Sequence, residues 1–394
     1  MINEIIPYGK HEITEEDINS VIEVLKTDNL TQGKNIFKFE ENYAKYVKSK
    51  YAVAVSNGTA ALHLCALALG VKPGDKVITT PITFVASANC VRYCGGEVVF
   101  SDIDPTNYLL DLKKIEKLLS SSPPGTFKGI IPVNFAGHCN NLEKLKKIAN
   151  KYNLWIIEDS CHSPGGYFID SDGKKQLSGN GSFADLSIFS FHPVKHIATG
   201  EGGMITTNNP ELYKLLLSLR SHGIYKNQSS FKNKLDISGG NKTYPNWYME
   251  MQNLGYNYRL TDIQSALGIS QLKRAEYNIE RRREIAKIYN DEFAKNQNIK
   301  SHSGFIPGHA YHLYIIEVEE RLELYNFLRK NKIFTQIHYI PCHYMPYYQD
   351  IGWKKGDFPV AENYYRRCIS LPMYPTLGKK QYYVIDKINE FYGT

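Results

Sequence analysis

Short apolar runs alternate with amphipathic segments through the first half of this 394-residue chain. Apolar runs of this length, with helix-like spacing between them, are typical of strands in a mainly parallel sheet that helices cover on both faces. The pattern therefore predicts an α/β fold with one doubly wound sheet of seven strands. The predicted strands are residues 51–56, 76–80, 97–102, 129–134, 154–158, 186–191 and 204–207.

Helical periodicity dominates the two ends of the chain. Residues 12–26 place apolar side chains at helical spacing, with Thr14 as the predicted N-cap and acidic residues in the first turn. The last third mixes helix and strand periodicities and predicts a smaller α+β domain. It contains predicted helices at 261–295, bent near Gly268, at 321–330 and at 379–391, and predicted strands at 310–318 and 334–340.

One long segment, residues 224–252, has little periodicity and is rich in Asn, Ser, Lys, Gly and Tyr. A connection of this length without regular structure is unusual inside a compact domain. We therefore expect a domain boundary there. The predicted parts are an N-terminal arm and helix at 1–33, a large domain at 34–250 and a small C-terminal domain at 251–394.

Composition narrows the class of protein. The chain has no run of about 18 apolar residues, and its N-terminus lacks the features of a signal peptide, so we expect a cytoplasmic protein without a membrane span. The formal net charge of +7 is spread without blocks of like charge, which argues against nucleic acid as a partner. Seven cysteines without a CxxC pair predict reduced thiols and no metal site.

A single lysine follows the apolar run 186–191 and precedes a glycine cluster. This residue, Lys195, lies where a buried strand is predicted to end. Burial lowers the pKa of an amine and makes it a nucleophile at neutral pH. Because most lysines in such loops extend into solvent, the interpretation depends on motifs elsewhere in the chain.

Two further motifs lie at predicted strand ends. Gly58, Thr59 and Ala60 form a strand–turn–helix junction, which directs backbone amides and a helix dipole towards an anion such as a phosphate. Glu158 and Asp159 end a buried strand, where a carboxylate needs a cationic partner. A capped turn without a ligand is the alternative for both motifs.

The run SFHPVKHIATGEGG at 190–203, read with Glu158-Asp159-Ser160 and Gly255-Tyr256-Asn257-Tyr258-Arg259, resembles the DegT/DnrJ/EryC1/StrS sugar aminotransferases. The resemblance extends from Ile6 nearly to the C-terminus. It implies a transferase of fold type I that uses pyridoxal 5'-phosphate (PLP).

The resemblance also implies roles for individual residues. Lys195 would bond to PLP, and Asp159 would hold the proton on the pyridine nitrogen. The PLP phosphate would lie on Gly58, Thr59, Ala60 and the Ser190 hydroxyl. Phe84 would stack on the ring, and His162 would lie beside it. The partner subunit's Asn257 would also reach the phosphate, so the active enzyme would be a homodimer with shared sites.

Substrate and product are likewise implied by the resemblance, which is strongest to members acting in pseudaminic acid biosynthesis. The substrates would be a UDP-linked 4-keto-6-deoxy-N-acetyl hexose and L-glutamate, and the product UDP-4-amino-4,6-dideoxy-N-acetyl-β-L-altrosamine. The alternatives are another nucleotide 4-keto sugar, of bacillosamine or aminoarabinose type, or a non-catalytic regulatory protein. Loss of Lys195 or Asp159 would favour the regulatory protein, and both are present. Candidate substrate-binding residues are Tyr8, Lys10, Thr31, His192, Arg259, His312 and His338.

Overall fold

The computed structural model describes residues 4–27, 29–233, 244–301 and 306–393. Its centre is a seven-stranded sheet in the order β2-β10-β9-β6-β5-β3-β4. Strand β10 is antiparallel to both neighbours, and the other pairs are parallel. The predicted mainly parallel sheet is therefore confirmed. The strands are β2 (Tyr51–Val55), β3 (Lys76–Thr79), β4 (Glu97–Phe100), β5 (Phe127–Ile131), β6 (Trp155–Asp159), β9 (Leu186–Ser190) and β10 (Gly203–Thr207).

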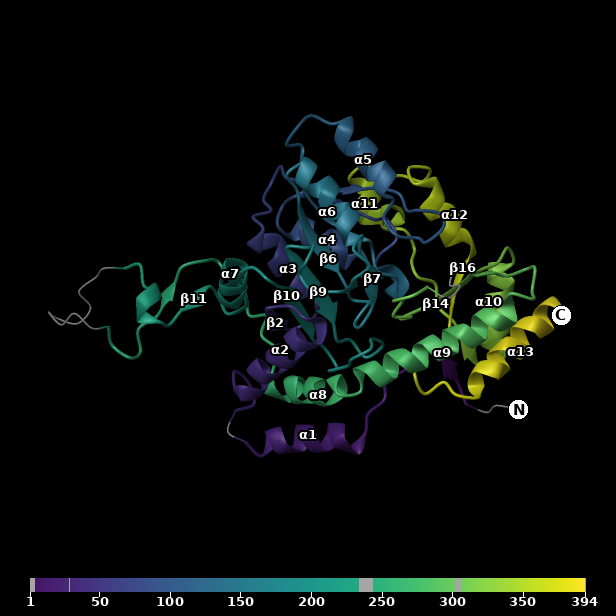
Figure 1. Cartoon of the computed structure of the whole chain (residues 1–394), viewed down its shortest axis with the longest axis horizontal. Helices are drawn as coiled ribbons and strands as arrows, with labels where there is room; N and C mark the ends of the chain where they lie inside the picture. Colours follow the sequence, from purple (N-terminus) through teal and green to yellow (C-terminus); the bar gives the residue numbers. More distant parts are fainter. Residues whose placement is uncertain (1–3, 28, 234–243, 302–305, 394) are drawn as a thin grey trace.

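Helices cover both faces of this sheet (Figure 1). Ile130 and Ile156 pack with α5 and α6 on one face, while their neighbours Ile131 and Ile157 pack with α3 and α4 on the other. Successive strand residues point to opposite faces, so a strand buried on both faces is apolar throughout. The helices are α2 (Lys34–Val47), α3 (Gly58–Ala68), α4 (Ala86–Tyr93), α5 (Leu112–Ser120), α6 (Leu142–Lys151) and α7 (Pro210–Arg220).

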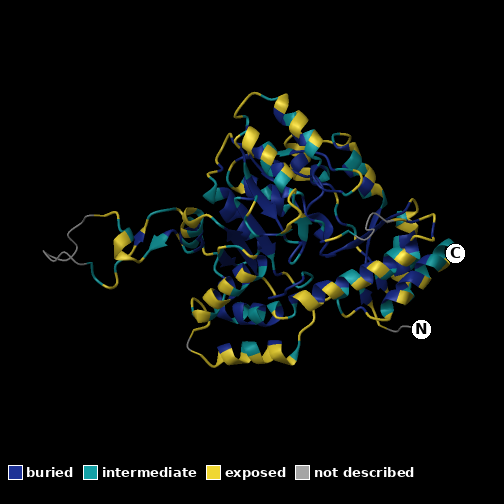
Figure 2. Ribbon diagram, viewed as in Figure 1, coloured by how far each residue is buried: buried dark blue, intermediate teal, exposed yellow. Residues whose placement is uncertain are grey.

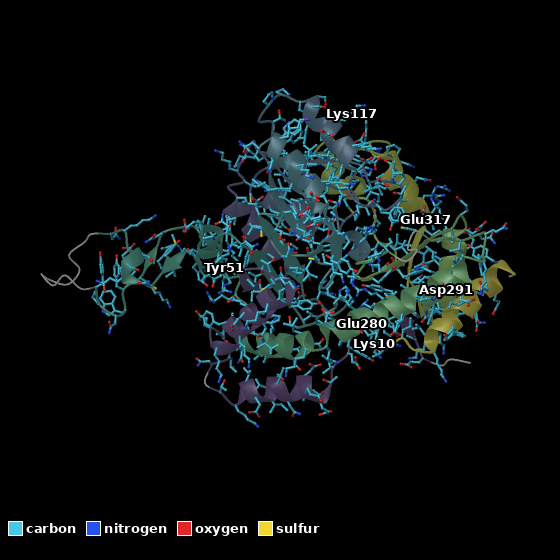
Figure 3. All side chains as sticks on the ribbon, in the orientation of Figure 1. Lys10, Tyr51, Lys117, Glu280, Asp291 and Glu317 are labelled. Carbon is cyan, nitrogen blue, oxygen red and sulfur yellow. The ribbon has the colours of Figure 1, made fainter. Side chains whose placement is uncertain are left out.

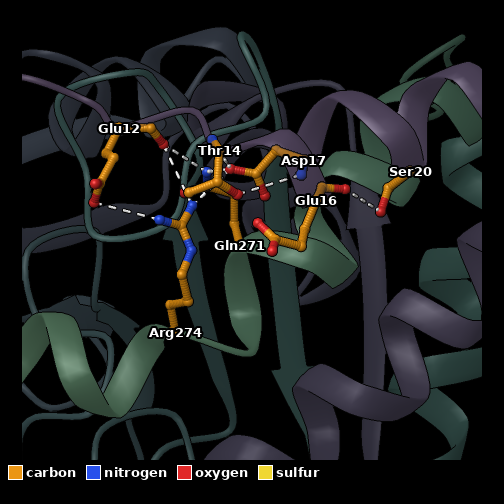
Figure 4. A network of polar contacts seen from close by, with 7 residues as sticks. All are labelled: Glu12, Thr14, Glu16, Asp17, Ser20, Gln271 and Arg274. Atoms are coloured by element: carbon orange, nitrogen blue, oxygen red, sulfur yellow. Dashed lines mark hydrogen bonds and ion pairs between the residues drawn. The ribbon is translucent and has the colours of Figure 1, made fainter.

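The N-terminal helix α1 (Glu15–Leu25) is joined to the body by one buried carboxylate. Thr14 caps the helix as predicted, in a capping box with Asp17. The Asp17 side chain accepts hydrogen bonds from Gln271 (2.7 Å) and Arg274 (2.6 Å), as Figure 4 shows. The outer face of α1 is exposed (Figure 2).

The predicted long helix at 261–295 is two helices, α8 (Asp262–Leu272) and α9 (Ala275–Phe293). They separate at residues 273 and 274, so the predicted bend at Gly268 was wrong. Gly268 has a packing role instead: a Cβ there would lie 2.5 Å from Cζ of Phe39. The glycine lets α8 approach α2 closely.

The C-terminal part contains the antiparallel sheet β13-β14-β16 and the parallel pair β1 and β15. The predicted strand at 310–318 is regular only in β14, and the one at 334–340 begins with β15 and continues as irregular chain. Both ends of the chain lie in this part (Figure 1), where Glu4 forms an ion pair of 2.6 Å with Lys380 at the start of α13. The elements are β1 (Ile6–Pro7), β13 (Lys300–Ser301), β14 (Tyr314–Glu317), α10 (Arg321–Lys330), β15 (Ile333–Phe334), α11 (Pro346–Asp350), α12 (Pro359–Arg367), β16 (Cys368–Leu371) and α13 (Lys380–Tyr392).

A narrow ribbon extends away from the body beyond α7 (Figure 1). It consists of β11 (Ile224–Tyr225) paired with β12 (Glu250–Met251) and the chain between them, of which 234–243 lie outside the described residues. The predicted long connection thus has a short strand at each end. A domain boundary at residue 250 stays a prediction, and α8 beyond it packs against α1 and α2. None of the helices in the described part of the chain has the length and apolar composition needed to cross a membrane.

Candidate active site

A cavity of about 710 Å³ opens where β6 and β9 end and α3 begins. This is the carboxyl edge of the parallel strands, where open α/β sheets bind ligands. Residues from distant parts of the sequence form its wall. They include Gly58, Phe84, Asp159, Ser190, Lys195 and Tyr339.

The start of α3 forms one end of the cavity. The Asn57 side chain caps the helix by accepting a hydrogen bond from the Ala60 amide at 2.8 Å. The amides of Gly58 and Thr59 lie before the first intrahelical hydrogen bond, so they have no acceptor within the helix. Helix N-termini that bind anions use amides of this kind. A Cβ on Gly58 would lie 3.1 Å from Cβ of Ser190. Glycine therefore lets the helix start directly beside the Ser190 hydroxyl.

The two acids at the end of β6 lie in different surroundings. Asp159 is 5% exposed and lines the cavity. It accepts hydrogen bonds from Ser87 Oγ (2.6 Å) and the Cys161 amide (3.1 Å). The bond from the Cys161 amide forms the local capped turn that was the ligand-free alternative for this motif. It nevertheless leaves the Asp159 carboxylate on the cavity wall.

Glu158 has a structural role. Its carboxylate accepts hydrogen bonds from Asn134 (2.8 Å), Ser187 (2.7 Å) and the Gly179 amide (2.9 Å). These donors join β6 to β9 and to the loops beside them. A buried carboxylate with its acceptor sites filled stabilises the fold and is not available to a ligand.

Lys195 lies between two cavities. It lines the large cavity, and with Lys10 and Arg282 it also lines a smaller one of about 20 Å³. Burial lowers the pKa of the Lys195 amine, while Cys161 and Asp159 act in the opposite direction. Its Nζ is 3.4 Å from Nε2 of His312. A half-buried amine with a lowered pKa beside a carboxylate can act as a nucleophile and as a proton carrier.

Three buried histidines stand beside Lys195. The ring of His312 lies 4.2 Å from that of His162 and 5.7 Å from that of His196. Burial lowers the pKa of all three imidazoles well below the ordinary value, and the positive charge of Lys195 adds to this effect. Neutral imidazoles therefore surround the amine at neutral pH.

The structure brings some predicted substrate-binding residues to the large cavity and leaves others outside it. Tyr8, His192 and His338 line the wall, and His312 touches Lys195. Lys10, labelled in Figure 3, lines the smaller cavity beside α9.

Three predicted site residues pair elsewhere in their own chain. Thr31 forms a bridge to Thr261, Arg259 to Val55, and the exposed Asn257 to Ser221. None of the three is among the residues that line the large cavity, although Tyr258, between Asn257 and Arg259, does line it. Within one subunit, Thr31 and Arg259 are therefore not parts of the large cavity.

Ser87 was not predicted from the sequence, whereas Tyr339 lies in the segment 337–343, whose His and Tyr residues were expected to bind a sugar diphosphate. Ser87 is on α4 and reaches Asp159 across the cavity wall. Tyr339 follows His338 in a segment predicted as a strand, in which adjacent residues would face opposite sides. Because the segment is irregular, both side chains line the cavity.

The cavity residues fit the chemical groups of PLP. The start of α3 with Ser190 suits a phosphate, the buried Asp159 suits a protonated pyridine nitrogen, and Lys195 supplies an amine. Phe84 is 59% exposed and stands on the wall as a flat apolar surface. Among the described residues, no group of three or more His, Cys, Asp or Glu is placed to hold a metal ion.

Comparison with known proteins gives matches along nearly the whole chain. The model of the DegT/DnrJ/EryC1/StrS aminotransferase family matches residues 11–389. A UDP-4-amino-4,6-dideoxy-N-acetyl-beta-L-altrosamine transaminase of Campylobacter jejuni is 36% identical, covering 95% of this chain and 94% of the relative. A GDP-perosamine synthase of Escherichia coli O157:H7 is 34% identical, covering 98% and 99%.

Solved structures agree with these relatives. PseC of Helicobacter pylori, an aminotransferase involved in the biosynthesis of pseudoaminic acid, has a TM-score of 0.86 and 30% identity, covering 99% of this chain and 100% of its own. The putative sugar aminotransferase Spr1654 of Streptococcus pneumoniae, in its PMP-form, has a TM-score of 0.86 and 28% identity, covering 98% of each chain.

Proposed function

This chain belongs to the DegT/DnrJ/EryC1/StrS aminotransferase family, and we propose that it adds an amino group to C4 of a UDP-linked 4-keto-6-deoxy-N-acetyl hexose. It is a PLP-dependent sugar aminotransferase that acts on nucleotide sugars. The proposed product is UDP-4-amino-4,6-dideoxy-N-acetyl-β-L-altrosamine, for pseudaminic acid, and the proposed amino donor is L-glutamate.

One observation carries the assignment of the reaction to this cavity: Lys195, Asp159 and the start of α3 all line it, although they come from three separate segments. The altrosamine transaminase and PseC support the proposed sugar. The GDP-perosamine synthase relative favours a second candidate, a GDP-linked keto sugar. The bacillosamine and aminoarabinose types stay alternatives from the sequence.

In the proposed site each residue has a defined task. Bound PLP supplies an electron sink for the carbon next to the transferred amine. The Gly58 and Thr59 amides and the Ser190 hydroxyl hold its phosphate, and the Asp159 carboxylate holds the proton on its ring nitrogen. Phe84 packs against the ring face.

Lys195 would hold the cofactor through its Nζ. When that amine is free, it would accept and return the proton that moves during amino transfer. The lowered pKa keeps a fraction of the amine neutral, as a base must be. The surrounding imidazoles, themselves neutral, do not add further positive charge around Nζ.

We further propose a homodimer in which the partner subunit's Asn257 completes the phosphate site. Asn257 is exposed and outside the cavity of its own chain, on the segment that pairs with Ser221 after α7. An exposed asparagine beside the sheet edge is free to reach a second copy.

The substrate proposal is tested by incubating the purified protein with PLP, glutamate and a panel of UDP- and GDP-linked 4-keto sugars, with mass spectrometry of the products. We expect the UDP-linked N-acetyl sugar to be converted fastest, and a Lys195→Ala control to convert none. Faster conversion of a GDP-linked sugar would show that this sugar, and not the UDP-linked one, is the substrate. A 4-amino product of different stereochemistry would show that the product is not the proposed altrosamine.

A further inference from the structure

The hydrogen bonds of His162 fix where its ring proton lies. The backbone amide of Ala136 donates to Nδ1 at 3.2 Å, and Nε2 is 3.0 Å from the hydroxyl of Tyr339. A ring nitrogen that accepts from an amide carries no proton. Burial and the charge of Lys195 hold the pKa of His162 far below the ordinary value, so the ring has a single proton. That proton is on Nε2, which therefore donates to Tyr339.

This arrangement makes the Tyr339 hydroxyl an acceptor towards His162 and leaves its own proton to be donated. Burial raises the pKa of Tyr339 well above the ordinary value, so the hydroxyl stays protonated. Both Tyr339 and His162 line the large cavity, so the bond between them lies in its wall. Among the described residues, His162 is the hydrogen-bond partner found for this hydroxyl.

Neighbouring rings limit how either side chain turns. The Tyr339 ring lies 6.1 Å from Phe135 and 6.5 Å from Phe84. The His162 ring lies 4.2 Å from His312. The hydroxyl is thus a donor held in one place before a ligand binds, and preorganised donors of this kind favour binding because little freedom is lost.

The surroundings of Tyr339 indicate which ligand uses it. The residues that suit the cofactor, Gly58, Asp159 and Ser190, come from the sheet edge. Tyr339 instead comes from the C-terminal part of the chain, next to His338, whose ring is 5.2 Å from that of Tyr8, and both of these are candidate substrate-binding residues. Both nitrogens of His162 are already bonded, so this residue does not add a donor of its own. A sugar presents hydroxyl and keto oxygens, which accept from a phenolic donor.

We propose that Tyr339 donates a hydrogen bond to an oxygen of the nucleotide-sugar substrate and that His162 is the residue that positions it. This inference rests on the sugar aminotransferase activity and does not depend on whether UDP or GDP carries the sugar. It separates the two half-reactions: the step with the amino donor does not use Tyr339, and the step with the sugar does.

The test compares Tyr339→Phe with wild-type holoenzyme and with Tyr382→Phe, a matched control on the exposed side of α13. We expect kcat/KM for the converted keto sugar to fall about 2- to 10-fold, as for one neutral hydrogen bond, mainly through KM. The rate at which glutamate converts the cofactor, followed by its visible absorbance, and the Kd for PLP should both match the control. Equal slowing of the glutamate step, or a weakened Kd for PLP, would overturn the proposal by showing that the hydroxyl serves the cofactor.

The positioning role of His162 has its own test. Glutamine also offers an acceptor and a donor, so His162→Gln should keep kcat/KM for the sugar nearer the wild-type value than His162→Leu. His162→Leu combined with Tyr339→Phe should be no worse than the more damaging single change. If the double variant instead loses kcat/KM by the product of the two single losses, and its near-UV circular dichroism matches theirs, His162 acts independently of Tyr339. If His162→Leu fails to fold, the Tyr339→Phe and His162→Gln results decide.

The panel of keto sugars separates failure of this inference from failure of the proposed substrate. Conversion of a GDP-linked sugar alone would replace the proposed substrate, and Tyr339→Phe would then be measured on that sugar. A wild-type protein that converts no nucleotide sugar would contradict both.

Discussion

Ser87 Oγ on α4 donates a hydrogen bond to Asp159 Oδ2 at the end of β6 over 2.6 Å. This bond crosses from one segment to another 72 residues later and fixes the orientation of a carboxylate that is 5% exposed. Thr83 Oγ1 lies 2.9 Å from the same serine hydroxyl. A carboxylate oriented in this way presents a defined negative charge to a protonated ring nitrogen.

Replacing Asp159 by Asn tests that charge. The variant should keep its fold and still bind PLP, but the ring nitrogen would lose the charge that holds its proton. Loss of one partner of a buried charge pair corresponds to about 2 to 5 kcal/mol, or about 30-fold to several thousand-fold in rate. The measurement is kcat of purified Asp159→Asn with saturating PLP; near-normal turnover would show that another group holds the ring nitrogen.

Glu158→Gln is the matched control for that variant. The glutamine amide would face the donors Asn134, Ser187 and Gly179 that now bond to the carboxylate. We expect a loss of about 1 to 3 kcal/mol in the free energy of unfolding, from donors left without acceptors. The folded fraction should retain its cofactor absorbance and most of its turnover.

The sheet was predictable because local sequence determines it. Strands such as β6 and β9 are apolar on both faces, and that signal needs no tertiary information. The capping residue Thr14 was also found from local chemistry, and it forms a capping box.

Other features depend on contacts between distant residues and were missed for that reason. Glycine has a low helix propensity, yet Gly268 lies within the regular helix α8, where Phe39 packs against it. The segment after β15 has strand-like composition, but beyond the bridge of Gln336 to Ser370 it finds no continuous strand partner among the described residues. Ser87 has no local motif, because its role arises only when α4 and β6 meet.

The stability of the fold should depend on a histidine away from the cavity wall. Burial lowers the pKa of His138 from its ordinary value of 6.5 to about 4. Between these values the unfolded chain binds a proton there that the folded chain does not. Stability therefore falls as pH decreases from about 6.5 to 4, by at most about 1.4 kcal/mol per pH unit for one group.

Urea unfolding at pH 7.5, 6.5 and 5.5 measures this dependence. His138→Gln has no proton to bind in that range, so its free energy of unfolding should change less with pH than that of the wild type. Identical pH slopes for the two proteins would exclude His138 as the source.

The proposed shared site predicts complementation between two inactive or weakened chains. In a mixed dimer of Lys195→Ala and Asn257→Ala, one site has both lesions and the other has neither. At limiting PLP the intact site should give about half the wild-type activity per mixed dimer, because losing one hydrogen bond to a charged phosphate weakens binding by about 1.5 to 3 kcal/mol. Activity no greater than the mean of the two parent homodimers would show that Asn257 does not serve a partner.

Peptide mapping directly tests the assignment of Lys195 as the residue that bonds to the cofactor. The protein is purified with PLP, reduced with borohydride, digested and analysed by mass spectrometry. We expect a pyridoxyl group on Lys195, near one per chain, and none in Lys195→Ala. A pyridoxyl group on Lys174, Lys175 or Lys226 instead, or an unmodified Lys195 in active protein, would contradict it.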